Sequence, residues 1–502
     1  MFTFQITWSP WTILLSLLFL LFVQVVRRTL LTPLRSIPGP FLAKISSLWL
    51  VSQCRRVRRS EAVIQQHRKY GDFVRIAPNH ISIASPQALK EIYGHKTGFI
   101  KGPFYDAFLQ GEPVLFNMRN QPAHQRRRKH FNPAFSPSNL KAFEPEVTKS
   151  VMKLKECLFR VADCVDSSLD FSRHGKFPAG SNFLAFDVIA DYAFGQTFGF
   201  LEKEKDYLNL ISTVDSRGEV LNALGHVSPW LRPAMKYNVF DQFWHNGLRA
   251  TGNLEAIGRQ AYFRRKSQQN PRKDLLSFLF NSKDPDTNQK LPEELIIAES
   301  ISFIVGGSDT TSTSMTHFID FVSRDPGLQK RLQEEMDAAF PEVSDEWVAD
   351  FAVAEKLPIL LATFRETMRI RPTSATGLER ITPPEGKVVA GRLIPGGTMV
   401  SVTTRSIFSD PRIFKNPEAF DVDRWLQPDS GAMLEYFNPF SLGPRSCIGR
   451  NFAWTEVIKT LATLLRTFEF KRLSDKPTEL REGFFVKVTE CMVKVSRRQD
   501  KI

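Results

Sequence analysis

Phe440-Ser441-Leu442-Gly443-Pro444-Arg445-Ser446-Cys447-Ile448-Gly449 places one cysteine in a short stretch that also carries two glycines and an arginine. Glycines let a backbone turn tightly, and a tight turn around a sulfur leaves backbone N–H groups free to hydrogen-bond its thiolate. A lone cysteine is more commonly a buried structural thiol, because it packs as a small hydrophobic side chain. The residues around Cys447 are what favour a ligand over a structural thiol.

This stretch resembles the haem-binding signature of the cytochrome P450 superfamily, Phe-x-x-Gly-x-Arg-x-Cys-x-Gly, at every fixed position. The resemblance implies that Cys447 is the axial ligand of the iron of haem b, that Arg445 faces a haem propionate, and that Phe440 packs beside the sulfur. A thiolate ligand donates electron density to haem iron and favours cleavage of a bound O–O bond. The resemblance also implies the cytochrome P450 fold, which is mainly α with small β-sheets (α+β).

Two further stretches resemble parts of the same family in the expected order. Glu366-Thr-Met-Arg369 matches its Glu-x-x-Arg motif, and the i, i+3 spacing puts both charges on one helix face. Phe420-Asp-Val-Asp-Arg424-Trp425 is similar to its Pro-Glu-Arg-Phe region, although Val422 and Asp423 depart from the common wording. The resemblance implies a structural charge network of Glu366, Arg369 and Arg424 that fixes the cysteine loop through charge-assisted hydrogen bonds.

A long helix is predicted over residues 295–321, with Pro292 near its start, where helices favour proline. In its middle, Gly306-Gly307-Ser308-Asp309-Thr310-Thr311 resembles the family's Ala/Gly-Gly-x-Asp/Glu-Thr motif on the helix that crosses the haem. Each glycine inside a helix lowers its stability by about 1 kcal/mol relative to alanine, so two of them indicate a packing or functional requirement. We expect the Thr310 hydroxyl to bond the Gly306 carbonyl and open a groove for O2, with Asp309 and Thr310 relaying protons. The alternative is a glycine-tolerant packing crossing with a solvated aspartate.

Basic side chains are expected at the haem propionates. His124-Gln-Arg-Arg-Arg128 stands where the family often has Trp-x-x-x-Arg, with His124 in place of the tryptophan. One helical turn apart, His124 and Arg128 are placed to share a propionate. Arg380 follows the Glu-x-x-Arg helix, where family members often have another propionate partner. The competing interpretation is that these basic residues are simply solvated.

The amino-terminal residues indicate a membrane anchor. Residues 8–26 contain no charged side chain, and nineteen helical residues at about 1.5 Å each span roughly 28 Å, close to the hydrocarbon thickness of a bilayer. Arg27 and Arg28 follow the span, which predicts a lumenal segment at 1–7 and a cytosolic catalytic domain, single-pass in the endoplasmic reticulum membrane. A cleaved secretory signal is disfavoured, because no positive segment precedes the apolar run and no small-residue cleavage site follows it.

The remaining chain divides into a basic, proline-rich linker at 27–60 and a cytochrome P450 catalytic domain at 61–502, although length alone allows two lobes or one large domain. Helical patterns predominate from 122 to 340. Alternating runs at 73–76 and 80–83 predict a β-hairpin, and 387–402 returns to strand character. Residues 484–488 and 491–495 are predicted to form another strand pair.

Charge and cysteine usage narrow the classes of function. The formal net charge is +14, and ten basic residues against one acid lie between Arg27 and Lys69. This excess directly follows an apolar segment, which favours an anionic membrane surface over nucleic acid, for which no motif is present. Five scattered cysteines form no CxxC pair, which fits a reducing compartment with mostly buried thiols rather than a disulfide framework.

The resemblance implies a monooxygenase that inserts one oxygen atom of O2 into an apolar small molecule. No flavin or nicotinamide fingerprint is present, so a separate protein must deliver the electrons. The family implies NADPH-cytochrome P450 reductase, with cytochrome b5 as an additional candidate donor. Basic residues flanking the cysteine face would suit an acidic donor; these are Arg126, Lys129, Arg445 and Arg450.

Several alternatives for the reaction stay open. We expect a phenylalanine-rich pocket, with substrate contacts from 99–116, 200–244, Phe303 and 374–378. Such a pocket favours a role in the modification of small molecules in secondary-metabolite biosynthesis. An aromatic-acid hydroxylase is the second candidate, because the sequence is similar to fungal benzoate-hydroxylase-like members. An O2-independent haem isomerase or cyclase would leave Asp309 and Thr310 without a role, and a non-catalytic haem sensor is the remaining class.

Overall fold

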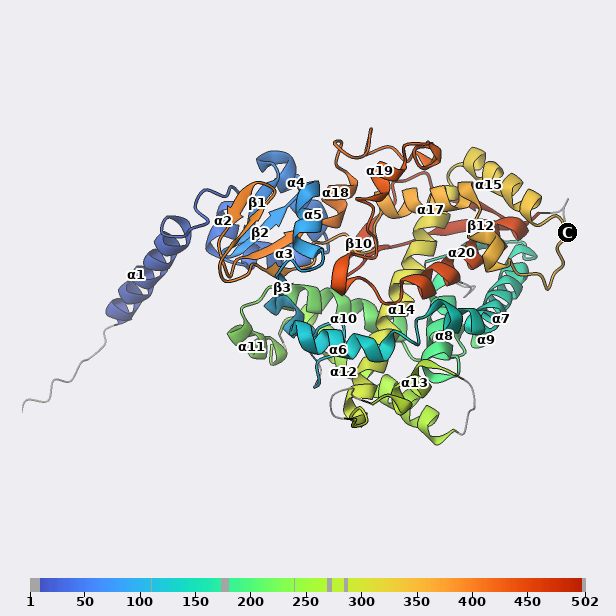
Figure 1. Cartoon of the computed structure of the whole chain (residues 1–502), viewed down its shortest axis with the longest axis horizontal. Coiled ribbons are helices and arrows are strands. Elements are labelled where there is room, and N and C mark those ends of the chain that lie inside the picture. The colour runs from blue at the N-terminus through green and yellow to red at the C-terminus, as the bar shows by residue number, and fades with distance from the viewer. Residues whose placement is uncertain are drawn as a thin grey trace, which may run out of the picture.

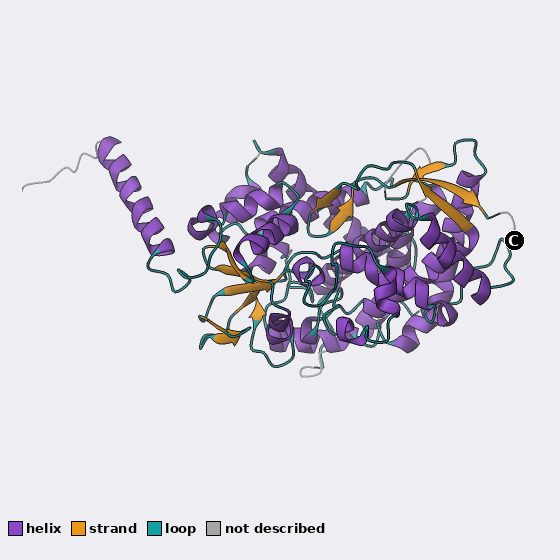
Figure 2. Ribbon diagram, turned by 90° about the horizontal axis from the view of Figure 1, so that it is seen from above, coloured by secondary structure: helices purple, strands orange, loops and turns teal. Residues whose placement is uncertain are grey.

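Helices form most of the body, and small sheets lie among them (Figures 1 and 2). This is a computed structural model, and it describes residues 10–109, 111–172, 180–238, 240–268, 273–283 and 288–498. The predicted mainly α architecture with small sheets is confirmed. The expected lumenal segment at 1–7 and the first two residues of the expected anchor lie outside the described residues.

The α-helices of the described residues are α1 (Pro10–Thr29), α2 (Phe41–Ile45), α3 (Leu48–Arg55), α4 (Arg59–Tyr70), α5 (Pro86–Tyr93), α6 (Gln121–Phe131), α7 (Pro137–Ala162), α8 (Ser181–Phe194), α9 (Phe200–Lys203), α10 (Leu210–Leu224), α11 (Arg232–Lys236), α12 (Gln242–Ser267), α13 (Leu275–Asn281), α14 (Glu293–Val322), α15 (Pro326–Ala339), α16 (Phe351–Ala354), α17 (Pro358–Ile370), α18 (Thr404–Phe408), α19 (Gly431–Leu434) and α20 (Arg450–Thr467). Short 3₁₀ turns are η1 (Pro103–Phe108), η2 (Pro229–Leu231), η3 (Val422–Leu426) and η4 (Gly443–Arg445).

The strands are β1 (Phe73–Ala77), β2 (His80–Ile83), β3 (Ile100–Lys101), β4 (Ser168–Asp170), β5 (Arg380–Ile381), β6 (Lys387–Val389), β7 (Arg392–Ile394), β8 (Met399–Val402), β9 (Phe468–Arg472), β10 (Leu480–Glu482), β11 (Val486–Val488) and β12 (Met492–Arg497). The largest sheet has the order β1-β2-β8-β5-β3, and the others are β4-β12-β9, β10-β11 and β6-β7. The predicted hairpin is present as β1 and β2, which pair antiparallel with Phe73 opposite Ile83.

One predicted strand pairing is wrong. Residues 484–488 and 491–495 do not pair with each other; β11 pairs with β10 before it, and β12 pairs with β9 and β4. The chain turns between β10 and β11 at Gly483, so β11 pairs with the strand that directly precedes it. Cys491 is drawn to β4 instead, because its N–H donates to Asp170 at 2.9 Å and its carbonyl accepts from Phe171.

The helix α14 runs through the middle of the body, as Figure 1 shows, and packs against α8, α12, α17 and α20. It covers the helix predicted over 295–321 and begins directly after Pro292. Apolar side chains such as Ile304, Met315 and Phe318 are buried along it, and this burial is the main force that holds it in place. A central buried helix thereby carries Asp309 and Thr310 into the interior.

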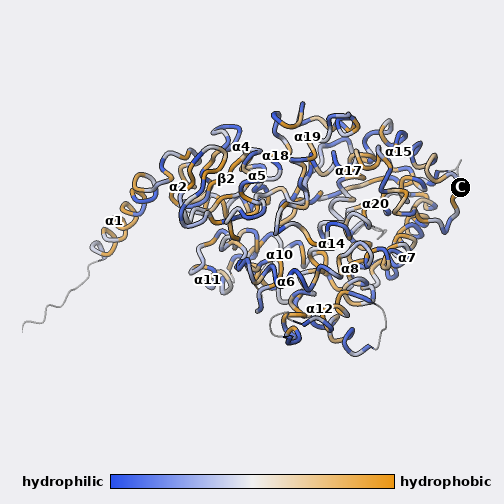
Figure 3. The backbone as a smooth tube through the Cα atoms, viewed as in Figure 1, coloured by the Kyte–Doolittle hydropathy of each residue, from blue (hydrophilic) through white to orange (hydrophobic). Residues whose placement is uncertain are grey.

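The amino-terminal helix α1 stands apart from the body. Its apolar residues are exposed, and the tube is hydrophobic along most of its length in Figure 3. Mean hydropathy is 1.9, and among the described residues it is the helix long and apolar enough to cross a bilayer. The following basic, proline-rich segment contains α2 and α3 and buries Leu34, Ile37 and Leu50, so much of 27–60 packs onto the body.

Glu366 on α17 lies at the centre of a buried charge network. Its carboxylate accepts two hydrogen bonds from Arg369, both at 2.8 Å, one from Arg424 Nε at 3.2 Å and one from Trp425 Nε1 at 2.8 Å. Arg369 also donates to the carbonyl oxygens of Phe408, Pro417 and Ala419. The structure therefore brings the three expected network residues together and ties the chain after α18 to α17.

Aromatic packing links this network to the cysteine stretch. The ring of Phe437 lies 5.0 Å from that of Trp425 and 5.3 Å from that of Phe408. Phe437 is three residues before Phe440, and the Phe440 carbonyl accepts a hydrogen bond from the Cys447 N–H at 2.9 Å. The position of the cysteine thus depends on side chains that are held around Glu366.

We expect Glu366→Gln to destabilise the protein by about 3–5 kcal/mol, because two buried guanidinium groups would lose their counter-charge. Asp423→Asn is the matched control, since Asp423 pairs with Arg331 at 2.6 Å on the surface. That exposed pair is worth less than about 1 kcal/mol. Urea denaturation of the detergent-solubilised protein measures both, and equal losses for the two variants would contradict the central role of Glu366.

Candidate active site

A cavity of about 580 Å³ lies deep in the body and joins segments that are far apart in the sequence. Residues of α6, α10, α14, the cysteine stretch and the β10–β11 hairpin line it. Every residue predicted at the haem or at the O2 groove is part of its wall: Asp309, Thr310, Cys447, Arg445, His124, Arg128, Arg380 and Phe440. Convergence of these groups in one cavity makes it the candidate active site.

Protein atoms surround Cys447, but its side chain is exposed to the cavity that it lines. Burial raises the pKa of this thiol, whereas a hydrogen bond from the Gly449 N–H and the nearby charges of Arg128 and Arg450 lower it. Gly443 has a φ of +66°, and a Cβ there would meet the Tyr93 carbonyl oxygen at 2.1 Å. Glycine is therefore required at that turn, which brings the stretch against α5.

Unmatched positive charge surrounds the edge of the cavity beside Cys447. Arg445 donates to the carbonyl oxygens of Met118 (2.7 Å) and Arg119 (3.1 Å), and Arg128 donates to the Ser446 carbonyl oxygen at 2.7 Å. Arg380 donates to the Tyr105 hydroxyl and to the Glu379 carbonyl oxygen. Among the residues that the structure describes, none of these three arginines forms an ion pair with a carboxylate.

Two further nitrogen groups share this environment. Burial, together with the charges of Arg445, Lys101, Arg128 and Arg380, lowers the pKa of His124 to about 3. Its buried Nδ1 has no hydrogen-bond partner within the described chain. Burial also lowers the pKa of Lys101, with the charges of Arg380 and Arg445 adding to the effect. Such a cluster lacks a dianion, and the two propionates of a haem fit this requirement.

Lys101 was not singled out by the sequence. It lies on β3 directly opposite Arg380 on β5, and its amine donates to the Phe116 carbonyl oxygen. One lysine in a two-residue strand carries no motif, so only strand pairing brings it to the arginines.

The two glycines of α14 have different surroundings. A Cβ on Gly306 would meet no atom within 4 Å, whereas a Cβ on Gly307 would lie 2.6 Å from Ile189 of α8. The Thr310 hydroxyl donates to the Gly306 carbonyl oxygen at 2.8 Å, as expected, and both residues line the cavity. Gly306 therefore leaves open space on the cavity side, and Gly307 allows close packing with α8.

Asp309 is buried and paired. Its carboxylate accepts a hydrogen bond from Lys487 on β11, and the same amine reaches Asp215 on α10. The pKa of Asp309 is raised to about 6, because burial and the Asp215 charge raise it by more than the Lys487 charge lowers it. The solvated aspartate of the alternative interpretation is therefore not what the structure shows.

Sequence reasoning missed Lys487 and Asp215. Lys487 alternates with Val486 and Val488, the pattern of a half-buried strand with an outward lysine. No local signal separates that pattern from a lysine that turns inward to a carboxylate. The pairing depends on how β11, α10 and α14 meet.

Aromatic rings form one wall of the cavity. Phe116 and Phe484 lie 5.5 Å apart, and Phe108 lies 5.4 Å from Phe116 and 5.2 Å from Phe484. Of the other residues expected near a substrate, Tyr105, Phe303, Ser374 and Leu378 line the cavity, and Phe104 packs behind Phe108. The region 200–244 contributes Val214, Asp215, Arg217, Gly218 and Glu219.

Comparison with known proteins agrees with the architecture and the site. The sequence profile of the family described as "Cytochrome P450" matches residues 38–495. Benzoate 4-monooxygenase bphA from Aspergillus niger is 36% identical over 98% of each chain. "Cytochrome P450 67" from Uromyces fabae is 31% identical over 91% of this chain and 84% of its own, and cytochrome P450 monooxygenase BOT4 from Botryotinia fuckeliana is 30% identical over 88% and 81%.

The match runs through the large sheet, α14, the network of Glu366 and the cysteine stretch, so it covers the parts that build the cavity. Haem is the cofactor of this family, and its members act as oxidoreductases on small molecules with O2 and electrons from redox partners. The chain belongs to the cytochrome P450 family of haem-dependent monooxygenases.

Proposed function

We propose that the protein is a membrane-bound haem-thiolate monooxygenase in which Cys447 is the axial ligand of the iron. One observation carries this proposal: the Cys447 thiol opens into a cavity whose walls also hold unmatched cations and the Thr310 groove of α14. When bound, the haem supplies the activation of O2 with two electrons. The chain supplies the ligand, the proton route and the shape of the pocket.

The residues around Cys447 would hold the cofactor in one orientation. The Gly449 N–H stabilises negative charge on the sulfur, and Phe440 lines the cavity beside it. His124, Arg128, Arg380 and Arg445 would bind the propionates, since charge-assisted hydrogen bonds to carboxylates satisfy buried guanidinium groups. Lys101 is added to this set by its position opposite Arg380.

Asp309 and Thr310 would deliver protons to the cavity. The Thr310 hydroxyl is fixed by the Gly306 carbonyl, and Asp309 lies next to it on α14. Lys487 holds Asp309 in its ionised form and links it to Asp215 on the adjacent helix. An ionisable group whose pKa is near the working pH is suited to transfer protons in both directions.

The substrate would be an apolar small molecule with room against Phe108, Phe116 and Phe484. Tailoring in secondary-metabolite biosynthesis is one candidate role. Hydroxylation of an aromatic acid is the second, and it is favoured by the 36% identity to a benzoate 4-monooxygenase over nearly the whole chain. An O2-independent isomerase would have no use for the Asp309–Thr310 pair, and a haem sensor would have no use for the roomy aromatic pocket.

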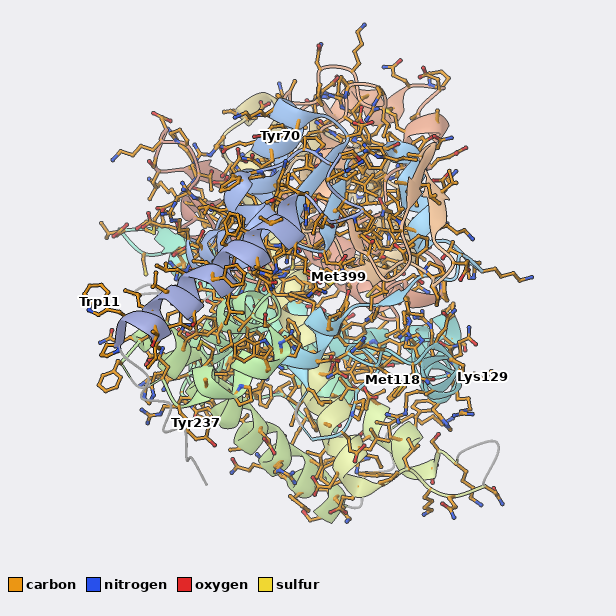
Figure 4. All side chains as sticks on the ribbon, turned by 90° about the vertical axis from the view of Figure 1, so that its left-hand side faces the viewer. Trp11, Tyr70, Met118, Lys129, Tyr237 and Met399 are labelled. Carbon is orange, nitrogen blue, oxygen red and sulfur yellow. The ribbon has the colours of Figure 1, made fainter. Side chains whose placement is uncertain are left out.

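Electrons would come from NADPH-cytochrome P450 reductase, with cytochrome b5 as an additional donor. Arg126, Lys129 and Arg450 are exposed on the part of the surface formed by α6 and the start of α20. Figure 4 shows Lys129 at the outer edge of the body. A basic surface near the cysteine stretch suits an acidic donor, because complementary charge steers association.

The membrane arrangement would be single-pass in the endoplasmic reticulum, with residues 1–7 in the lumen, the anchor beginning at residue 8 and the catalytic body in the cytosol. Exposed Trp11 of α1 and exposed Tyr237 after α11 lie on the same side of the molecule in Figure 4. Aromatic side chains of this kind favour the membrane interface. Positive charge after the span favours the cytosolic side for the body.

We expect Cys447→Ser to remove the thiolate signature from the reduced, CO-bound difference spectrum and to abolish NADPH- and O2-dependent product formation in microsomes with reductase. The physical reason is that a hydroxyl at this position cannot supply the electron-rich sulfur. Cys164→Ser is the matched control, because Cys164 is half-buried and does not line the cavity. A Cys447→Ser protein with an unchanged spectrum would remove the ligand assignment, and turnover without O2 would favour the isomerase.

Turnover should depend on the ionisation of Asp309. The carboxylate is protonated as the pH falls through about 6, so product formation is expected to decline below that pH. Lys487→Met removes the cation that lowers this pKa, and the declining limb should then move to higher pH. Asp309→Asn should lower product formation by about 10²–10⁴-fold, the usual contribution of general acid–base catalysis.

Lys494→Met on β12 is the control for the loss of one lysine, since Lys494 is exposed. Its pH profile, measured with the same reductase, should coincide with that of the wild-type protein. A Lys487→Met profile that also coincides would show that Lys487 does not control Asp309.

Protease digestion of intact microsomes tests the topology. A tag at the carboxyl end should be digested, and a tag before residue 1 should be protected, because the body is expected in the cytosol. Opening the membranes with detergent is the control, which should expose both tags. Loss of the amino-terminal tag during synthesis would instead indicate a cleaved signal.

A further inference from the structure

Arg217 on α10 is a cation in the cavity wall that has no partner. No hydrogen bond or ion pair reaches it from any residue that the structure describes, and its Nε is buried without a hydrogen-bond partner. Burial by itself lowers the pKa of Arg217 to about 10, so the guanidinium stays charged at neutral pH. An unpaired charge in such a place is costly, and a structure tolerates it where a ligand supplies the counter-charge.

The acids nearest to Arg217 in the sequence pair with other cations. Asp215 is bound by Lys487, and Glu219 accepts two hydrogen bonds from Arg481, one of them at 2.9 Å. Both acids lie on the same helix, two residues to either side of Arg217. The local carboxylates are therefore committed elsewhere, which leaves Arg217 as the unmatched charge of α10.

Arg217 also lies next to the aromatic wall. A Cβ on Gly218 would lie 3.7 Å from the backbone nitrogen of Phe484, so the tip of the β10–β11 hairpin rests directly on this turn of α10. The same helix reaches the O2 groove through Asp215, Lys487 and Asp309. A guanidinium, a set of rings and the proton route thus belong to one continuous wall.

We propose that Arg217 determines specificity by binding the carboxylate of an aromatic monocarboxylic acid, whose ring lies along Phe108, Phe116 and Phe484. Guanidinium groups bind carboxylates through two parallel hydrogen bonds, and this geometry orients the acid as well as holding it. A neutral ester leaves the guanidinium of Arg217 without a counter-charge, so the ester is rejected. The proposal rests on the monooxygenase function, and it selects acids from the small molecules that the pocket could hold.

Binding of acid–ester pairs to the purified, haem-loaded protein tests the proposal. The probes are benzoate, 1-naphthoate and 3-phenylpropionate, each beside its methyl ester, and the readout is the change in haem absorption on titration together with calorimetry. We expect the wild-type protein to bind at least one acid about 30-fold or more tightly than its ester, from the usual cost of truncating one partner of a buried charge pair. Arg217→Met should remove that preference, and Arg217→Lys should keep part of it, because a lysine retains the charge but not the fork geometry.

Arg249→Met is the matched control, because Arg249 is exposed on α12 and does not line the cavity. It should bind acids and esters as the wild-type protein does. The proposal is overturned if wild-type protein binds none of the three acids, if it binds the esters equally well, or if Arg217→Met keeps the acid preference. The thiolate spectrum is recorded on every sample, so loss of the haem site, which would refute the monooxygenase itself, is distinguished from failure of Arg217 to recognise a carboxylate.

Discussion

A buried charge is stable only with a partner of opposite charge. In this protein the buried acids pair with some of the buried cations, and other cations have no carboxylate partner within the described chain. Glu366 serves Arg369 and Arg424, and Asp309 and Asp215 share Lys487. In contrast, the arginines at the cysteine edge of the cavity donate hydrogen bonds only to carbonyl and hydroxyl oxygens. Because an unpaired buried charge is costly, these places favour the binding of anions.

This distribution divides the cavity into two regions with different requirements. The cations beside Cys447 fit a group that carries two carboxylates, which is what a haem offers. Arg217 lies on α10 and lines the same cavity as Phe108, Phe116 and Phe484, where we propose that the substrate binds. One wall therefore suits the cofactor, and the other suits a ligand that is mostly apolar and singly charged.

The helix α14 joins the two regions because it is both tightly packed and locally open. Gly307 allows α8 to approach, and Gly306 leaves space where Thr310 bonds its carbonyl. Packing along the rest of the helix keeps this opening fixed, since apolar side chains on both sides of the motif are buried. A groove held in this way can present Asp309 and Thr310 to the cavity without movement of the helix.

The sequence by itself determined the family, the helical architecture, the apolar amino-terminal helix and the residues of the cysteine stretch, because these are carried by local spacing and composition. Tertiary structure alone decided which distant residues meet. Lys487 pairs with Asp309, which lies 178 residues before it in the sequence, and Lys101 lies opposite Arg380 because their strands pair. Arg217 has no partner among the described residues, because the acids beside it pair with Arg481 and Lys487 of the β10–β11 hairpin. It also decided that β11 pairs with β10 rather than with β12. Such contacts leave no periodic signal, since a lone charge in a strand or helix reads the same whether it faces solvent or a buried partner.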